Sequence, residues 1–371
     1  MPSDHFVPQH YLRHFSSDNK RIVAATLTPY RFLGQVPIEG QCQANNFYEL
    51  NTTLNQMLWC SENDIAPVLV SVIHKKDFNL HEANALKLLA VIFHMRTRKA
   101  AECAKVFPKY MAKEFIQNAM RRGELPPLPE GNVLEEVIDF SGASGFLMSQ
   151  MIPCWIETQT LDCKLVESAP GVEFITSDNP VSILNQFCVD MKSLHSSVGF
   201  SKAGFQLLMP ISPNLCLICY DAKVYKLGNR RDRVVRISAN DVEIVNALQI
   251  QTADTSIYWH DINLRSGIER IVGHYSGLRV PLTDILRVIP CTNANEELLH
   301  LTAPSVKLPK VWDFCRYRRH IFCKPGDRRE PLWTQLAQDL TNDIEHNPNP
   351  DRDIYARMEN IINQYELAAR R

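Results

Sequence analysis

The sequence lacks any segment long and apolar enough to carry the chain across a membrane. Its longest apolar stretches, residues 86–93 and 205–209, fall far short of the roughly 20 residues that a membrane-spanning helix needs. The first residues hold no basic segment followed by an apolar run, so no secretory signal is expected. The 11 cysteines are odd in number and scattered, which is typical of reduced thiols and not of a disulfide framework. The sequence therefore predicts a cytoplasmic protein without a membrane partner.

An excess of charge of either sign is also missing. The chain has 40 Lys and Arg residues against 41 Asp and Glu, a formal net charge of −1. Nothing therefore draws the whole molecule towards nucleic acid or lipid, and any such binding would need a local patch. Hydrophobic residues make up 45% of the 371 and charged residues 22%, which excludes a disordered, collagen-like or coiled-coil chain and leaves room for two domains, or one domain with an appendage.

Most sequence signatures of catalysis are absent. There is no glycine-rich phosphate loop, paired-histidine zinc helix, strand–turn–helix serine motif or dinucleotide fingerprint, which argues against a nucleotide-driven motor, a zinc protease and a Rossmann dehydrogenase. Cys216 and Cys219 lie in an apolar strand, where side chains alternate between faces, so we expect two core cysteines that point opposite ways. Cys315, His320 and Cys323 match no common zinc module, so no structural zinc is expected.

The order of the predicted elements indicates an α+β fold. Periodic apolar residues predict helices over residues 54–74, 80–106, 110–122, 133–151, 333–345 and 353–370. Short β-rich segments follow Pro153, and those at residues 205–210 and 215–220 predict a hairpin. Ser238 is placed as the N-cap of a further helix. We therefore expect a mainly helical N-terminal half packed on a small antiparallel sheet, with C-terminal helices.

Two clusters of arginine could supply a local basic patch. Residues 316–329 interleave Arg316, Arg318 and Arg319 with aromatic side chains, a combination that suits phosphate contact and base stacking. Residues 230–236 carry four more arginines. The alternative is a solvated basic surface, because a neutral chain must also expose its arginines somewhere.

Asp162-Cys163-Lys164 has the acid-x-Lys form of many metal-dependent nucleases. In those sites the acid holds a divalent cation and the lysine helps to orient the attacking water. The alternative is an exposed strand face, because so short a pattern arises often by chance. The cofactor therefore stays open, with a divalent metal as the candidate that this pattern admits.

A polar turn follows the strand predicted at residues 173–176. Asp178 and Asn179 can serve there as a base, a ligand or an orienting group, or they can form an Asx-turn that satisfies the local backbone. Arg96, on the helix after an apolar run, can be a buried partner of Glu62 or Asp178. It can equally belong to a site.

The opening of the chain resembles that of a known bacterial family. His5 to Ser16 read His-Phe-Val-Pro-Gln-His-Tyr-Leu-Arg-His-Phe-Ser, which is similar to the start of the family catalogued as domain of unknown function 4238. Further matching segments occur in the family's order, at residues 61–69, at Arg96, at residues 174–181 and at residues 246–249. The resemblance covers roughly residues 5–260.

The resemblance implies a domain over residues 1–300, with a helical half at about 50–152 and a sheet-rich half at about 155–260, followed by a basic, helical appendage over residues 301–371. Some members are reported among antiphage defence genes, so it implies a bacterial or prophage-borne defence effector. The family has no settled activity and supplies no assured catalytic residue.

We expect a nuclease-like effector that cleaves phosphodiester bonds, with RNA as the favoured target. The expected catalytic residues are His5, Arg13, Glu62, Arg96 and Asp178. The expected substrate-binding residues are Gln9, Asn179, Arg316, Arg318 and Arg319. A histidine and a carboxylate can perform the proton transfers, and arginine can stabilise the charge that develops on the phosphate. His5 and Asp178 should then meet in one pocket with Arg96.

The alternative is a sensor without catalysis. Such a protein would recognise a phage or host protein through its helical half and trigger toxicity by interaction. Separate positions for His5 and Asp178, each bound by neighbouring backbone, would favour this second reading.

Overall fold

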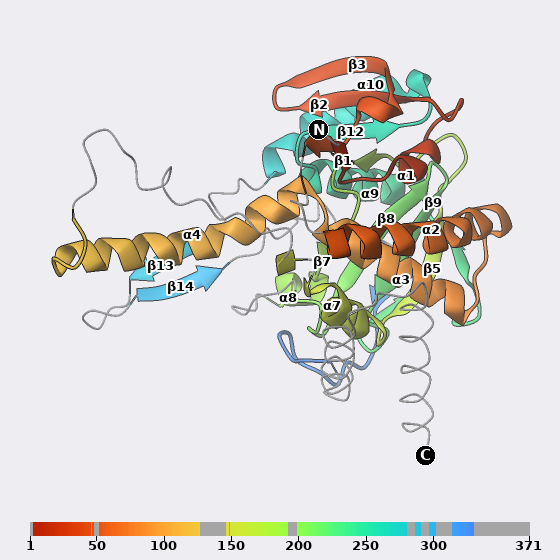
Figure 1. Cartoon of the computed structure of the whole chain (residues 1–371). Helices are drawn as coiled ribbons and strands as arrows, with labels where there is room; N and C mark the ends of the chain where they lie inside the picture. The colour runs from red at the N-terminus through yellow and green to blue at the C-terminus, as the bar shows by residue number, and fades with distance from the viewer. Residues whose placement is uncertain are drawn as a thin grey trace.

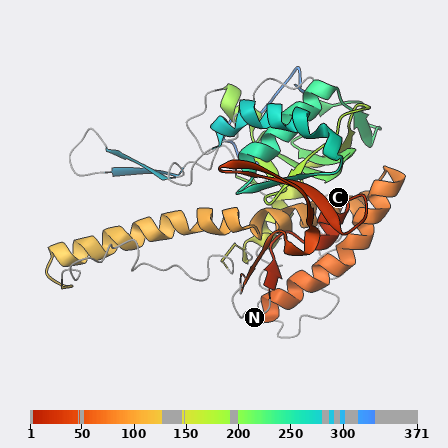
Figure 2. The same ribbon diagram turned by 90° about the horizontal axis from the view of Figure 1, so that it is seen from above.

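The computed structural model describes residues 3–45, 47, 52–126, 146–147, 149–191, 199–279, 286–290, 297–301 and 314–329. Within these residues, no helix is long and apolar enough to cross a bilayer. Two sheets and the helices around them form the body of the molecule, and one long helix extends outward from it (Figures 1 and 2).

The larger sheet has five strands and is mixed. Its order is β11 (Val234–Arg236), β5 (Asp162–Glu167), β9 (Leu215–Tyr220), β8 (Gln206–Ser212) and β7 (Ser182–Leu184). β11 runs parallel to β5, whereas the other neighbours are antiparallel. The expected hairpin is confirmed as β8 and β9.

The second sheet has four antiparallel strands and joins distant parts of the chain. Its order is β3 (Tyr30–Pro37), β2 (Arg21–Leu27), β12 (Ser256–Trp259) and β6 (Thr176–Ser177). Smaller pairs are formed by β1 (Ser3–His5) with β4 (Gln43–Asn45), β10 (Tyr225–Leu227) with β15 (Cys315–Tyr317), and β13 (Leu286–Pro290) with β14 (Glu297–Leu301).

The helices are distributed along the whole described chain. They are α1 (Gln9–Arg13), α2 (Thr52–Lys75), α3 (Leu80–Met95), α4 (Arg98–Arg121), α7 (Met151–Thr158), α8 (Gln186–Asp190), α9 (Ala239–Thr252) and α10 (Arg265–Tyr275), with short 3-10 turns at Ile38–Gly40, Ile262–Leu264 and Ser276–Leu278. Ser238 caps α9 as expected, since its hydroxyl accepts from the Asp241 N–H and the Asp241 side chain bonds back.

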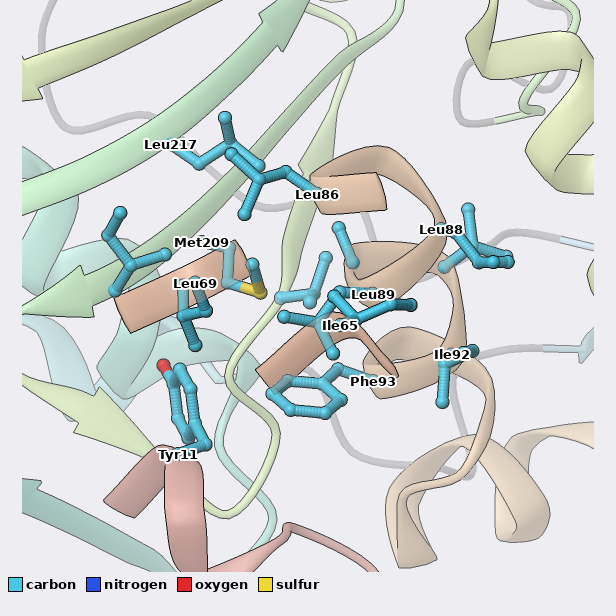
Figure 3. Packing of buried hydrophobic residues seen from close by; sticks show 14 of the residues in the cluster. Tyr11, Ile65, Leu69, Leu86, Leu88, Leu89, Ile92, Phe93, Met209 and Leu217 are labelled. Atoms are coloured by element: carbon cyan, nitrogen blue, oxygen red, sulfur yellow. The ribbon is translucent and has the colours of Figure 1, made fainter. Parts of the chain in front are cut away.

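The larger sheet is covered on both faces. Met209 and Leu217 point to the face that packs on α3, where Leu86 and Leu89 are fully buried (Figure 3). Leu208 and Ile218, one residue along each strand, point to the face covered by α9. Each of these leucines contributes about 1.5–3 kcal/mol of burial free energy. α3 is buried over nearly its whole surface, and its side chains are apolar nearly all round, as is typical of a buried helix.

The helix expected over residues 80–106 is in fact two helices. α3 ends at Met95, with Arg96 as its C-cap. Thr97 then takes an extended backbone (ψ 155°), and its hydroxyl accepts from the Ala100 N–H as the N-cap of α4. A threonine oxygen at this position satisfies a backbone N–H that the helix itself cannot, so the N-cap favours a break that apolar spacing does not reveal.

The expected small antiparallel sheet with C-terminal helices is wrong. The five-stranded sheet is larger than expected and mixed, and a second sheet draws two of its strands from the first 40 residues. The long helices α2 to α4 lie in the N-terminal and central chain. β2 pairs with β12 across more than 200 residues, a contact that local strand patterns cannot show. The helices expected at residues 333–345 and 353–370, and most of that at 133–151, lie outside the described residues.

Residues 314–329 of the expected appendage pack against the rest of the chain. β15 pairs with β10, and the buried Arg329 guanidinium donates to the Thr160 hydroxyl (2.9 Å) and to the carbonyls of Lys202 (2.7 Å) and Glu157 (2.8 Å). A buried guanidinium that donates to several carbonyls holds its segment in one place.

Candidate functional site

The N-terminal motif builds a ladder of polar side chains beside α1. The His5 Nδ1 lies 3.1 Å from the Gln41 carbonyl and its Nε2 lies 2.9 Å from the Gln9 amide nitrogen, while Arg13 donates to the Gln9 oxygen at 2.8 Å. A carbonyl can only accept, so Nδ1 of His5 carries the proton and Nε2 accepts from Gln9. These contacts fix the orientation of the imidazole ring.

The apolar side of the same motif is structural. The Tyr11 hydroxyl is completely buried and bonds the Thr176 hydroxyl (2.7 Å) and the Pro210 carbonyl (2.5 Å), which belong to the two different sheets. Tyr11 therefore connects β6 to β8, so the N-terminal segment links the two sheets through these hydrogen bonds.

Arg96 is buried as predicted, at 5% exposed, and its Nη2 donates to the His5 carbonyl at 2.5 Å. It thus contacts the backbone of His5. Nearby His10 is partly buried. Burial, followed by the charges of His14, Arg96 and Arg13, lowers the pKa of His10 to about 4. The side chain of Glu62, the expected ion-pair partner, lies outside the described residues.

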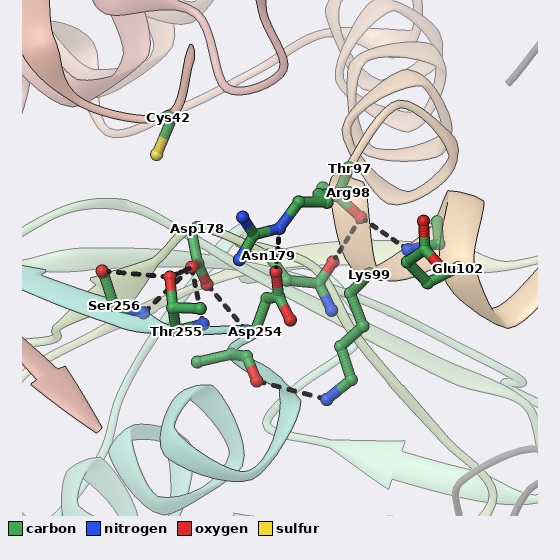
Figure 4. Close-up of polar contacts among 12 residues, drawn as sticks. Cys42, Thr97, Arg98, Lys99, Glu102, Asp178, Asn179, Asp254, Thr255 and Ser256 are labelled. Carbon is green, nitrogen blue, oxygen red and sulfur yellow. Dashed lines mark hydrogen bonds and ion pairs between the residues drawn. The ribbon is translucent and has the colours of Figure 1, made fainter. Parts of the chain in front are cut away.

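Asp178 holds the turn between α9 and β12. Its Oδ1 accepts from the Asp254 N–H (2.8 Å), and its Oδ2 accepts from the N–H groups of Thr255 (2.7 Å) and Ser256 (2.9 Å) and from the Thr255 hydroxyl (2.7 Å) (Figure 4). Burial raises the pKa of the Asp178 carboxyl, and the bonds from Thr255 and Asp254 oppose that rise. This Asp is bonded as a clamp on the backbone.

Asn179 extends the same clamp to α4. Its Oδ1 accepts from the Thr97 hydroxyl (3.1 Å) and its Nδ2 donates to the Thr252 carbonyl (2.8 Å). Lys99 adds a cation at the C-terminal end of α9, where it donates to the Thr252 and Ala253 carbonyls (Figure 4). The polar turn therefore joins the start of one helix to the end of another.

His5 and Asp178 belong to neighbouring networks. The Tyr258 hydroxyl donates to the Gln41 side chain at 3.4 Å and accepts from the Cys42 thiol at 3.4 Å. The four bonds to the Asp178 carboxylate come from residues 254–256, and the His5 ring bonds Gln9 and Gln41. The shared catalytic site of His5, Arg13, Glu62, Arg96 and Asp178 stays a prediction.

A separate basic pocket opens where β5, β9 and the β10–β15 pair meet. It consists of two adjoining hollows of about 430 and 450 Å³ that share Asp162, Lys164 and Arg230. The first is also lined by Tyr220, Ala222, Lys226, Leu227, Gly228 and Arg318, and the second by Cys163, Arg231, Asp232 and Arg233. We call this combined surface the basic pocket.

Cationic side chains dominate the basic pocket. Its lining holds six Lys and Arg residues and two Asp residues, a formal excess of four positive charges in a chain whose net charge is −1. Lys164 is 4% exposed, its Nζ donates to the Asn229 carbonyl, and burial lowers its pKa. Concentrated charge of one sign in a hollow attracts anionic ligands.

The structure brings together three patterns that the sequence offered separately. Asp162 and Lys164 lie on β5, Arg230 to Arg233 lie in the loop before β11, and Arg318 follows β15. The Arg318 backbone N–H donates to the Val224 carbonyl at 2.9 Å, which fixes it beside β10.

The other expected basic residues take different positions. Arg236 pairs with Glu167 (2.8 Å) outside the pocket. Arg316 lies opposite Lys226 in the β10–β15 pair, and Arg319 is exposed after it. Tyr220 and Lys226 were missed by sequence reasoning, because no local pattern marks them as neighbours of Asp162.

In the described part of the chain, no three His, Cys, Asp or Glu side chains cluster in a way that could hold a metal ion. Asp162 and Asp232 are the carboxylates on the pocket.

Fold and pocket together define a protein with a mixed five-stranded sheet, a second four-stranded sheet, surrounding helices and a basic surface pocket. The chain belongs to the family described as protein of unknown function (DUF4238), whose model matches residues 4–262. No curated protein and no solved structure matches the chain. The family match includes Asp162, Lys164 and Arg230, whereas Arg318 lies beyond it.

Proposed function

We propose that this chain is a nucleic-acid-binding protein of bacterial antiphage defence, and that its basic pocket takes the phosphodiester backbone. The observation that carries the proposal is the convergence of Lys164, Arg230 and Arg318 on one hollow from three distant segments. Arginine and lysine bind phosphate oxygens through charge-assisted hydrogen bonds, and two close arginines can hold successive phosphates.

Binding is tested with fluorescently labelled single-stranded RNA and DNA at several salt concentrations. Three to four phosphate contacts predict a slope of log affinity against log salt of about −2 to −3, since each contact on a single strand contributes about −0.7. The double variant Arg230→Ala/Arg318→Ala should weaken binding and flatten this slope. Arg270→Ala is the matched control, because Arg270 is an exposed arginine on α10 that pairs with Glu243. Equal affinity and slope in both variants would contradict the proposal.

We further propose that the pocket cleaves the phosphodiester that it holds. Lys164 would stabilise the negative charge that develops on the phosphate, and Asp162 would orient the attacking water, with or without a divalent cation. The test incubates RNA and DNA with the full chain, with Mg²⁺ or with chelator. Cleavage should require Lys164 and Asp162 and be lost in Lys164→Met and Asp162→Asn. If the wild-type chain binds nucleic acid but does not cleave it, the proposed cleavage is refuted and the proposed binding stands.

One observation favours the second candidate, a sensor without catalysis. Asp178, the expected carboxylate of the N-terminal site, uses both oxygens to bind the 254–256 turn. A protein that binds nucleic acid and does not cleave it, but captures a phage protein when the two are expressed together, would support this reading.

A further inference from the structure

Two cysteines face each other across the central strands of the larger sheet. Cys163 on β5 and Cys219 on β9 are directly opposite in the antiparallel register, and their sulfur atoms are 2.7 Å apart. Opposed residues in an antiparallel pair have Cα atoms about 4.5–5.5 Å apart, within the range of about 4.4–6.8 Å that a disulfide requires. The backbone therefore already has the spacing of a cross-strand disulfide.

The surroundings of this pair favour a reactive thiolate. Burial opposes the charged form of Cys163, but its hydrogen bond with Cys219 and the positive charge of Lys87 outweigh burial and lower its pKa. Lys87 comes from α3 and is itself 5% exposed. Cys163 also lines one hollow of the basic pocket, together with Asp162 and Lys164.

The pair is joined to the pocket by its neighbours in sequence. Asp162 and Lys164 flank Cys163, Tyr220 follows Cys219, and all three line the pocket. Asp162 and Tyr220 form the adjacent cross-strand pair. A bond between the two sulfurs, about 2.05 Å long, would link β5 and β9 covalently at this edge of the pocket.

We propose that Cys163 and Cys219 form a reversible disulfide that regulates ligand binding in the basic pocket. With hydrogen peroxide as the oxidant, the Cys163 thiolate attacks one oxygen and becomes a sulfenic acid, and the other oxygen leaves as hydroxide and takes up a proton to form water. The Cys219 thiol then attacks that sulfur, the S–S bond forms, and the sulfenic oxygen leaves as a second water. Two thiols are oxidised and one peroxide is reduced. The regulatory half rests on the proposed function of the pocket, whereas the disulfide does not.

The disulfide is tested first, by mass spectrometry of the full chain treated with peroxide under non-reducing conditions. We expect one linked peptide pair containing Cys163 and Cys219, which disappears on reduction with dithiothreitol. Cys163→Ala and Cys219→Ala should abolish it. Cys216→Ala is the matched control, because Cys216 lies on the same strand, is fully buried and faces the opposite side of the sheet against Val166. If circular dichroism shows that the peroxide-treated wild-type protein is folded and mass spectrometry finds no linked pair, the proposal is overturned.

Regulation is tested next, by measuring the affinity for single-stranded RNA in reduced and oxidised protein. We expect oxidation to change the affinity of the wild-type protein for RNA at least threefold, and reduction to restore it. In Cys163→Ala, treatment with the oxidant should not change the affinity. A disulfide that forms without altering the affinity overturns the regulatory half. A protein that forms the disulfide but binds no RNA in either state refutes the proposed nucleic-acid function and leaves the disulfide established.

Discussion

Replacing Asp178 separates a structural role from a catalytic one. Asp178→Ala deletes the acceptor of three backbone N–H groups and one hydroxyl, in a side chain that is 2% exposed. Asp178→Asn keeps one oxygen, which can still accept at the crowded position opposite Thr255 and Ser256. It places an amide NH₂ against the Asp254 N–H, where two donors face each other.

The expected losses follow from the number of donors left without an acceptor. A donor stripped of its partner costs about 1–3 kcal/mol, and the low end applies here because Thr255 is exposed and water can reach the turn. Asp178→Ala should therefore lower the free energy of unfolding by about 3 kcal/mol, and Asp178→Asn by about 1–2 kcal/mol, because it loses one of these bonds and a charge.

Urea unfolding followed by circular dichroism measures both losses. Asp254→Asn is the matched control in the same turn, because its carboxylate forms a partly exposed pair with Arg98 that contributes about 1 kcal/mol or less. If both Asp178 variants unfold within about 0.5 kcal/mol of wild type while cellular activity is lost, the clamp is wrong and the catalytic role expected from the sequence gains support.

Two paired substitutions test other buried cations by the same method. Arg96→Ala should lower the free energy of unfolding by about 1.5–3 kcal/mol, because it removes a charged donor to the His5 carbonyl. Arg98→Ala should lower it by about 1 kcal/mol or less, because the Arg98 side chain is 46% exposed. Equal losses in the two variants would contradict the inward placement of Arg96. Arg329→Ala should lower the free energy of unfolding by at least about 3 kcal/mol and expose residues 314–329 to protease. Arg328→Ala is the control and should lower it by about 1 kcal/mol or less, because the Arg328 side chain is 47% exposed and pairs with Glu157. An unchanged digestion pattern in Arg329→Ala would show that other contacts hold the segment.

Features set by neighbours in the sequence were predictable. The β8–β9 hairpin, the Ser238 cap and the opposite orientations of Cys216 and Cys219 follow from strand alternation and capping chemistry, which act over a few residues. The family resemblance rested on the motif at residues 5–16 and is confirmed by a match to residues 4–262.

Features set by distant contacts were not predictable. The acid-x-Lys pattern and each arginine cluster are individually common, and only the pairing of β10 with β15 and of β5 with β11 brings them to one hollow. Asp178 shows the opposite case: its sequence context suits a base or a clamp equally, and the choice depends on the turn at residues 254–256.

Acid should destabilise this fold through two partly buried histidines, His10 and His94. Burial lowers the pKa of His94 to about 4, and burial with the charges of His14, Arg96 and Arg13 does the same for His10. The unfolded chain takes up protons at these positions below about pH 6.5 and the folded chain only near pH 4, so the free energy of unfolding falls as the pH falls through that window. At pH 5 the loss should be about 1–2 kcal/mol for each histidine, relative to pH 7.5. Urea unfolding at both pH values should show a smaller loss in the double variant His10→Gln/His94→Gln than in wild type or in the exposed control His320→Gln. An equal loss in all three proteins would mean that other groups cause the acid sensitivity.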